Sequence, residues 1–152
     1  MSDERRRLFP ETLPLSQLQE KVKGTMIEHV GIEYLECGPD YLKARMPVDH
    51  RTVQTYGILH GGASAVLAET LGSVASVLIV DREKYLPVGL EINVNHLRPV
   101  RQGWVIGTAR PIHVGKKTHV WDVRIHDESG KLVSVSRLTV MVVARAEIEP
   151  GR

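Results

Sequence analysis

The sequence predicts a single α+β domain in which an antiparallel six-stranded sheet wraps around one long central helix. Three observations predict this fold class. Residues 61–80 form an apolar stretch with one charge, Glu69, and the stretch has the length of a buried helix. Two short segments of alternating apolar and polar residues precede it, and four longer segments follow it. Tight turns join the later segments, which favours antiparallel hairpins and a sheet packed on a helix.

The elements expected before the long helix are short. The helical spacing of apolar residues in Leu15–Lys23 predicts a first helix that ends at Gly24. Strands are expected at Gly31–Cys37 and Tyr41–Met46, because the Gly-Pro-Asp sequence between them is typical of a turn. The mixed composition of residues 47–59 predicts a long loop. The 152 residues therefore divide into an N-terminal arm with a short helix, a core and a tail, at residues 1–25, 26–144 and 145–152.

The stretch 61–80 is the most unusual part of the chain. Its length suits a membrane span, but its Gly, Ser, Thr and Glu content favours a helix buried in a core. Leu67, Leu71, Val74 and Leu78 form an apolar stripe at helical spacing, which we expect to face the sheet. Four strands are expected after this helix, at residues 88–95, 104–114, 121–126 and 132–143.

Composition excludes several classes of protein. Lys and Arg number 20 and Asp and Glu 18, and the net charge of +2 gives no reason to expect a nucleic-acid partner. Cys37 is the only cysteine, so the chain cannot form an internal disulfide, and a cytoplasmic location fits best. Aromatic residues make up 5% of the chain, too few for a base-stacking surface. An enzyme and a small-molecule binding protein both stay open.

Glu69 is the strongest candidate for chemistry. An unpaired carboxylate on an apolar helix is costly to bury, so it must find hydrogen-bond donors or lie at a cleft. Ser73 lies one turn further along the same helical face. His60, Gly61 and Gly62 stand at the start of the helix, where unpaired N–H groups and the positive end of the helix dipole can stabilise an oxyanion.

The spacing of these residues has a consequence for assembly. Gly61 and Glu69 are separated by about 12 Å of helix rise at about 1.5 Å per residue. One carbonyl group therefore cannot contact both of them within one chain. The separation closes when two copies meet so that the start of one helix faces Glu69 of the other. The sequence thus predicts a site that a second copy completes.

Other interpretations of the same residues stay open. One is a structural helix with a hydrogen-bonded glutamate and a loop histidine. No metal site is expected, because His-x-His, His-x-x-x-His, His-Glu-x-x-His and Cys-x-x-Cys spacings are absent from the sequence. The Gly-x-Ser-x-Gly elbow of serine hydrolases and the glycine-rich loops of nucleotide-binding proteins are absent as well.

The segment from Gln54 to Ser73 resembles the active-site signature of hotdog-fold acyl-CoA thioesterases. Its elements are Gln54, His60-Gly61-Gly62-Ala63-Ser64, Glu69 and Ser73. The likeness continues in Val88–Asn93, Asn95-His96, His113–Gly115, Trp121 and Ser136–Thr139, and covers roughly residues 26–143. It is to the branch of 4-hydroxybenzoyl-CoA, phenylacetyl-CoA and 1,4-dihydroxy-2-naphthoyl-CoA thioesterases, which also includes the enterobactin proofreading thioesterases. The joint spacing of Gln, His-Gly-Gly and Glu makes the likeness specific.

The resemblance implies a catalytic role for each residue of the signature. Glu69 would attack the thioester or activate water. The backbone N–H of Gly61 would polarise the thioester carbonyl. His60 and Gln54 would orient that carbonyl or the leaving group, and Ser73 would position water or the acyl group.

The resemblance also implies positions near coenzyme A (CoA). They lie beside the helix start, at strand ends or in turns, and are Gly62, Gly89, Asn95, His96, Arg98, Pro99, His113, Gly115, Lys116, Lys117 and Thr118. Arg98, Lys116 and Lys117 carry the charge that phosphate oxygens attract. Solvated hairpin charges without a ligand explain these three residues nearly as well.

The fold and substrate implied by the resemblance define the expected partners. We expect an acyl-CoA substrate with an aromatic or medium-chain acyl group, and a homodimer as the catalytic unit, arranged as a dimer of dimers. No metal or organic cofactor is expected, since CoA is part of the substrate, and neither a nucleic-acid nor a membrane partner is expected. A non-catalytic acyl-CoA-binding protein stays open, as does a hotdog-fold hydratase or dehydratase, although such enzymes typically use a histidine base where this helix carries Glu69.

Overall fold

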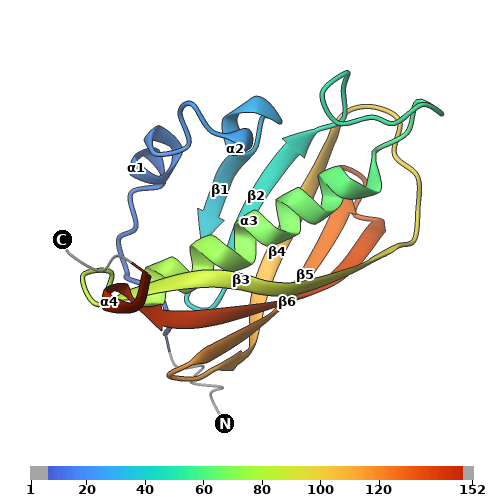
Figure 1. The fold of residues 1–152 in the computed structure, drawn as a ribbon. Helices are drawn as coiled ribbons and strands as arrows, with labels where there is room; N and C mark the ends of the chain where they lie inside the picture. The colour runs from blue at the N-terminus through green and yellow to red at the C-terminus, as the bar shows by residue number, and fades with distance from the viewer. Residues whose placement is uncertain (1–6, 149–152) are drawn as a thin grey trace, which may run out of the picture.

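One antiparallel sheet curves around one long helix in the computed structural model, which describes residues 7–148 (Figure 1). The strands are β1 (Glu33–Cys37), β2 (Leu42–Pro47), β3 (Tyr85–His96), β4 (Trp104–Val114), β5 (Thr118–Asp127) and β6 (Leu132–Ala144). Their order in the sheet is β1-β2-β4-β5-β6-β3, and every neighbouring pair is antiparallel. The helix α3 (Gly61–Ile79) lies in the hollow of the curved sheet. The predicted six-stranded sheet around one helix is confirmed.

The helix α3 forms the centre of the hydrophobic core. Leu67 and Leu71 are fully buried and face the sheet, where Trp121 of β5 and Leu138 of β6 are fully buried as well. Gly72 lets the helix approach closely, because a Cβ there would lie 2.5 Å from a methyl group of Leu138. α3 has the length and hydropathy of a membrane span, and here its apolar face packs on the sheet.

A buried polar cluster fastens α3 to β5. The indole Nε1–H of Trp121 donates a hydrogen bond of 2.8 Å to Ser76 Oγ, and Nδ1 of His119 lies 3.0 Å from the same oxygen. Burial lowers the pKa of His119 below its usual value. The cluster therefore favours a neutral imidazole, and it satisfies three polar groups that would otherwise be unpaired in the core.

The two edges of the sheet differ in length. β1 has 5 residues, whereas β3 has 12 and forms the opposite edge. Val88 and Leu90 of β3 are 45% and 61% exposed, so this edge presents apolar side chains together with unpaired backbone groups. A β-bulge between Gly89 and Glu91 interrupts the pairing of β3 with β6.

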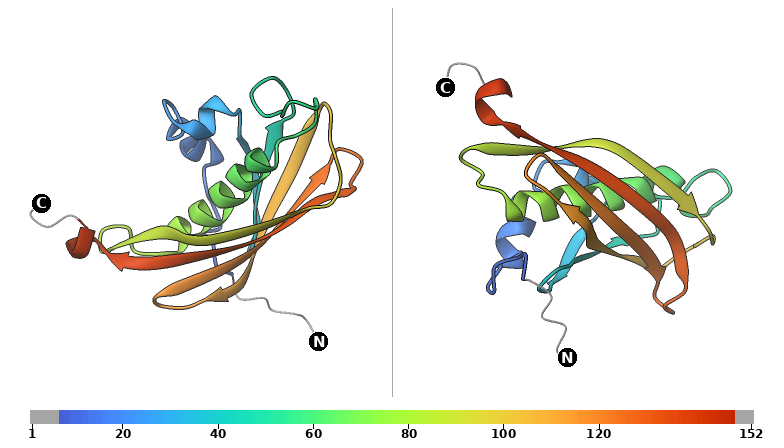
Figure 2. Two further views of the ribbon diagram at one scale, coloured as in Figure 1. Left: turned by 45° about the vertical axis from the view of Figure 1, so that its right-hand side comes forward. Right: turned by 90° about the horizontal axis from the view of Figure 1, so that it is seen from below.

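The N-terminal segment packs beside the sheet and the far end of α3, as the two views in Figure 2 show. The expected first helix is present as α1 (Leu15–Glu20), and turns follow it up to Gly24. Two short helices were not expected, α2 (Met26–His29) and α4 (Arg145–Ile148). The first six residues of the expected arm and residues 149–152 of the expected tail lie outside the described residues.

Candidate functional site

The start of α3 is capped by the residue before it. His60 is the N-cap, and its Nδ1 accepts a hydrogen bond of 2.7 Å from the backbone N–H of Gly62. Because Nδ1 accepts here, the proton of the neutral imidazole is on Nε2, which becomes a donor. The backbone N–H of Gly61 also lies at this positive end of the helix, in the first turn where no intrahelical partner exists.

Gln54 is held in one orientation by its own loop. Its side-chain Oε1 accepts a hydrogen bond from the backbone N–H of Tyr56, and its backbone N–H donates to Ile58 O. Since the amide oxygen is occupied, the NH₂ group of Gln54 is the part left to bind a ligand. Gln54 and Gly61 line one cavity and offer it hydrogen-bond donors, a set that suits a carbonyl oxygen or an oxyanion, whereas His60 lies beside them at the helix start and does not line that cavity.

A cavity of about 430 Å³ lies beside this donor set. Its lining includes five of the predicted site residues, from the loop before α3, from α3, from β3 and from the segment after β3, namely Gln54, Gly61, His96, Arg98 and Pro99. The absence of a side chain at Gly61 makes room for the imidazole of His96, since a Cβ there would lie 2.6 Å from His96 Nε2. The helix start and the end of β3 thus form one wall.

Glu69 lies on a different part of α3, against β3. Its half-buried carboxylate accepts a hydrogen bond of 3.2 Å from Ser73 Oγ. A Cβ built on Gly89 would lie only 2.1 Å from Glu69 Oε1, so the carboxylate rests directly on the backbone of β3 at this glycine. Gly89 was expected near CoA, and its contact in the chain is with the carboxylate.

The carboxylate and the donor set remain separate within one chain. Glu69 is eight residues along α3 from Gly61, about 12 Å of rise, and it does not line the cavity beside the helix start. Gly89 and His96 lie seven residues apart on β3, about 23 Å in an extended strand. We call the donor set with its cavity the donor half-site, and Glu69 with Ser73 and Gly89 the carboxylate half-site.

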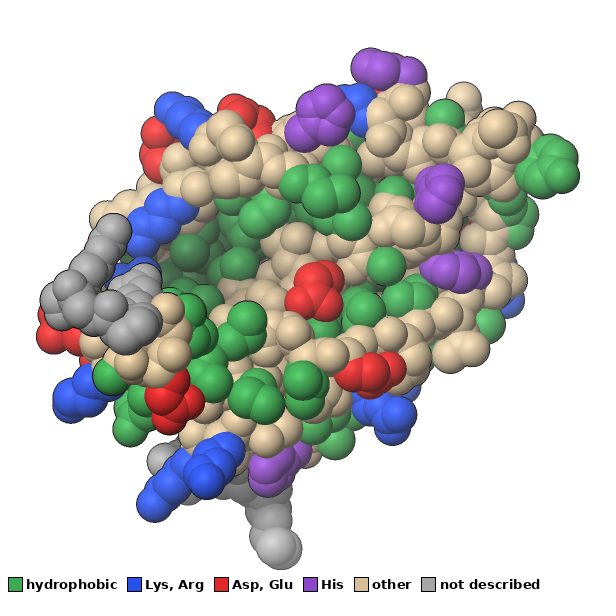
Figure 3. Space-filling view, in the orientation of Figure 1, with side chains coloured by type: hydrophobic (Ala, Val, Ile, Leu, Met, Phe, Trp, Pro, Cys, Tyr) green, Lys and Arg blue, Asp and Glu red, His purple; other side chains and the backbone are tan. Residues whose placement is uncertain are grey.

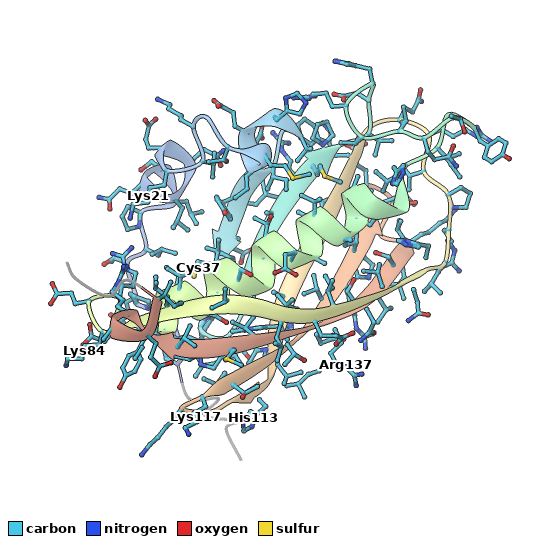
Figure 4. All side chains as sticks on the ribbon, viewed as in Figure 1. Lys21, Cys37, Lys84, His113, Lys117 and Arg137 are labelled. Carbon is cyan, nitrogen blue, oxygen red and sulfur yellow. The ribbon has the colours of Figure 1, made fainter. Side chains whose placement is uncertain are left out.

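The predicted CoA-binding residues fall into two groups as well. Arg98 and Pro99 belong to the donor half-site, and Gly62 and the exposed Asn95 lie beside it on α3 and β3. Figure 4 shows His113 and Lys117 at the other end of the sheet, far from the start of α3. With them in the hairpin between β4 and β5 are Gly115, Lys116 and Thr118.

The hairpin lies level with the carboxylate half-site. The backbone carbonyl of Lys117 accepts a hydrogen bond from Val142 N–H, and Thr118 pairs with Met141 of β6. Met141 in turn pairs with Val88, next to Gly89. One chain therefore carries its predicted phosphate-binding cations in two places, Arg98 at the donor half-site and the two lysines in a hairpin that is level, along the strands, with the carboxylate half-site.

Sequence reasoning missed two contributors to the site. Ser64 is almost fully buried in the first turn of α3 and lines the cavity beside the helix start. Tyr56 fixes the amide of Gln54 through its backbone N–H. The role of Ser64 could have been predicted from its position within the signature. The role of Tyr56 could not, because a backbone N–H donor leaves no pattern in the sequence.

Other parts of the described chain give weaker candidates. A hollow of about 550 Å³ on the outer face of the sheet is lined by charged side chains that are already paired, such as Arg110 with Asp40 and Arg124 with Asp122, both at 3.0 Å. Within residues 7–148 no three His, Cys, Asp or Glu side chains come together as a metal site.

Comparisons with known proteins show the family of the chain. The profile of the Thioesterase superfamily matches residues 56–134. A putative esterase of Pseudomonas aeruginosa is 49% identical over 139 residues, with 91% of this chain and 96% of that protein covered. The 1,4-dihydroxy-2-naphthoyl-CoA hydrolase of Escherichia coli K12 is 44% identical, with 90% and 99% covered. The proofreading thioesterase EntH of Cronobacter turicensis is 47% identical, with 90% and 98% covered.

Solved structures give the same result. The crystal structure of a Pseudomonas aeruginosa thioesterase, a variant with one glutamine replaced by alanine, superposes with a TM-score of 0.88 at 48% identity. It covers 90% of this chain and 99% of its own. A thioesterase of Haemophilus influenzae superposes with a TM-score of 0.88 at 45% identity, with 95% and 99% covered. The hotdog fold expected from the sequence is confirmed.

Proposed function

Because the chain belongs to the thioesterase superfamily and is a thioester-hydrolysing enzyme, we propose that it hydrolyses acyl-CoA thioesters to the free acid and CoA. The acyl groups are aromatic or of medium chain length, and the aromatic class is that of the substrate named for the related 1,4-dihydroxy-2-naphthoyl-CoA hydrolase. The observation that carries the proposal is the pair of half-sites, a set of hydrogen-bond donors and a carboxylate, on one helix.

The donor half-site would bind the thioester carbonyl. The N–H of Gly61, the NH₂ of Gln54 and the Nε2–H of His60 would stabilise the oxygen as it gains negative charge. This set offers hydrogens to the oxygen and presents no competing negative charge. We expect it to favour the tetrahedral intermediate over the planar thioester, which is the requirement for catalysis.

The carboxylate half-site would supply the reaction partner. In one route Glu69 removes a proton from water, and the resulting hydroxide attacks the carbonyl carbon. The carbon–sulfur bond then breaks, and Glu69 gives the proton back to the sulfur of the leaving CoA. In the other route Glu69 attacks the carbon and forms an anhydride as the carbon–sulfur bond breaks, and CoA leaves as a thiolate that takes a proton from water; water then hydrolyses the anhydride to the free acid and regenerates Glu69. Ser73 donates a hydrogen bond to the carboxylate and would hold it in place in either route. Label found in Glu69 after a single turnover in H₂¹⁸O would establish the anhydride route, because water reaches the glutamate carboxyl carbon only by attacking the anhydride there.

A homodimer would unite the two half-sites. β3 is a long edge strand with exposed Val88 and Leu90, a surface suited to pairing with the same strand of a second copy. An antiparallel pairing centred between Ile92 and Asn93 would set Gly89 opposite His96 of the partner subunit. Glu69 of one subunit would then lie near the donor half-site of the other.

The same pairing would collect the cations for the CoA phosphates. The hairpin with Lys116 and Lys117 lies level with Gly89, so it would approach Arg98 of the partner subunit. Three positive charges from two subunits would then surround the nucleotide end of the substrate. We further propose that two such dimers form a homotetramer. CoA is needed only as part of the substrate. The protein acts in the cytoplasm, where one unpaired cysteine is stable.

A thiol-release assay over a panel of acyl-CoAs tests the activity directly. We expect Glu69→Ala to lower turnover by several orders of magnitude while the protein remains folded, because the variant removes the group that starts the reaction. Glu69→Ala with the activity of the parent protein would contradict the role of this carboxylate.

Mixed oligomers test the shared site. Glu69→Ala subunits and Gln54→Ala subunits each lack one half-site, so a heterodimer carries one intact site and one with both defects. We expect a mixture to regain up to about a quarter of the parent activity after subunit exchange, since about half of the dimers are mixed and each has one of two sites. Mass spectrometry first shows that the subunits have exchanged. If the exchanged mixture then regains no activity, a site built across the interface is refuted.

A further inference from the structure

A second groove of about 200 Å³ lies between the N-terminal segment and the C-terminal end of α3, and both apolar and polar side chains line it. Leu13 and Leu18 form part of one wall, and Val77, Leu78 and Val80 form part of the other. Figure 3 shows a hollow lined by hydrophobic side chains on this face of the molecule. The groove contains neither of the half-sites described above.

The groove is connected to the carboxylate half-site along the surface of α3. Glu69, Ser73 and Val77 are spaced four residues apart and therefore lie on one face of the helix. All three are half-buried, so the face between the carboxylate and the groove is accessible rather than covered by the core. The distance along the helix from Glu69 to Val77 is about 12 Å.

We propose that this groove binds the distal carbons of a medium-chain acyl group whose thioester carbon lies at Glu69. The inference rests on the proposed function and adds to it a subsite that selects chain length. An extended alkyl chain of about ten carbons covers the 12 Å to Val77, because each bond of about 1.5 Å advances the chain by slightly less than its length. An aliphatic cavity of about 150 Å³ is large enough for benzene, so this groove has room for roughly six carbons.

Charged residues at the groove do not oppose an apolar occupant. Lys21 and Arg82 contribute to the lining, and both side chains are exposed. Such side chains cover apolar surface with their alkyl stems while the charge stays in water. Figure 4 places Lys21 at the outer side of the N-terminal segment.

One wall of the groove comes from the N-terminal segment. Leu13 and Leu18 precede residues 56–134, the part that matches the superfamily profile. The N-terminal segment therefore supplies a surface that α3 does not form by itself. A wall of this kind can change the accepted chain length without disturbing Glu69.

Variants that fill the groove test the proposal. Val77→Phe and Leu13→Trp enlarge a side chain on opposite walls, and Leu35→Trp is the matched control, because Leu35 is 39% exposed on β1 and does not line the groove. Each methylene buried by the wild-type groove is worth about fourfold in kcat/KM. We expect both filling variants to lower kcat/KM at least tenfold for dodecanoyl-CoA, which extends about two carbons beyond Val77, and to leave hexanoyl-CoA within about twofold of the parent, because hexanoyl ends before Val77.

The outcomes separate this proposal from the proposed function. An equal loss for both substrates, or an unchanged kcat/KM for dodecanoyl-CoA, would overturn the groove as a tail site even though the hydrolase activity stands. If the parent protein hydrolyses no acyl-CoA of the panel, the proposed function fails, and the affinities of the stable thioethers dodecyl-CoA and hexyl-CoA, measured by calorimetry, test the groove alone. Tighter binding of dodecyl-CoA that the filling variants abolish supports the groove, and equal binding of the two thioethers refutes it.

Discussion

Replacing Gly89 by alanine is a sharp test of how the carboxylate is positioned. A Cβ at this position would lie 2.1 Å from Glu69 Oε1, whereas ordinary van der Waals contact begins at 3.4 Å, so the carboxylate must move by about 1.3 Å. That displacement breaks or lengthens the hydrogen bond of 3.2 Å from Ser73. A misplacement of about 1 Å in a reacting group lowers the rate about 100-fold, equivalent to about 2.7 kcal/mol of activation free energy.

The same substitution has little effect on folding. The atom that collides with the new methyl group is the end of a flexible side chain, which can rotate toward solvent. We therefore expect the free energy of unfolding of Gly89→Ala to stay within about 0.5 kcal/mol of the parent value. Turnover of the best acyl-CoA should fall about 100-fold, with the folded fraction checked by denaturant titration.

Gly107→Ala is the matched control with the opposite pattern. A Cβ at Gly107 would lie 2.6 Å from Leu71 Cδ1 in the core between β4 and α3, so the variant should lose about 1–3 kcal/mol of stability. Glu69 is not in contact with Gly107, and turnover per folded molecule should remain that of the parent. Parent-like turnover in Gly89→Ala would refute the claim that the backbone of β3 positions the carboxylate.

The remaining predictions concern the polar groups of the core. Ser76→Ala removes the shared partner of His119 and Trp121, and we expect the free energy of unfolding to fall by about 1–3 kcal/mol in denaturant titrations. Ser136→Ala should have no effect or stabilise slightly, because the buried Ser136 hydroxyl has no hydrogen-bond partner among the residues described, and equal losses in the two variants would contradict this explanation. The lowered pKa of His119 means that the unfolded chain binds more protons below about pH 6.5. Stability should therefore decrease as the pH falls from about 6.5 toward the lower folded-state pKa, and His119→Gln should flatten this slope; an unchanged slope in that variant would contradict the role of His119.

Local spacing was sufficient to predict the parts of the molecule that depend on neighbours in sequence. The i, i+4 relation of Glu69 and Ser73 follows from helical geometry, and the structure shows the hydrogen bond between them. The hairpins were predicted from their turn residues, and the long helix from its composition. The start of β3 was placed three residues late, because pairing of Tyr85 with Ala144 extends the strand across Pro87, where local propensity favours an end.

Contacts between distant segments could not be predicted in this way. The meeting of Gly89 with Glu69 depends on how β3 lies against α3, and this follows from the packing of the whole core. The orientation of the Gln54 amide depends on a backbone N–H, which any residue at position 56 other than proline would supply. The groove beside Val77 exists only because the N-terminal segment returns to the end of α3. Each of these features depends on register and packing rather than on residue type.

The separation of the two half-sites follows from the chemistry they would perform. A carboxylate placed beside the NH₂ of Gln54, the Nε2–H of His60 and the N–H of Gly61 would accept their hydrogen bonds itself. The donor half-site and the carboxylate would then hydrogen-bond to each other. An incoming carbonyl group would have to displace these charge-assisted hydrogen bonds before it could bind the donors. About 12 Å of helix between Gly61 and Glu69 prevents this within one chain. In the proposed dimer the two halves face each other with the thioester between them, so the substrate carbonyl is the group that engages the donors, and the carboxylate remains available for the proton or the carbon.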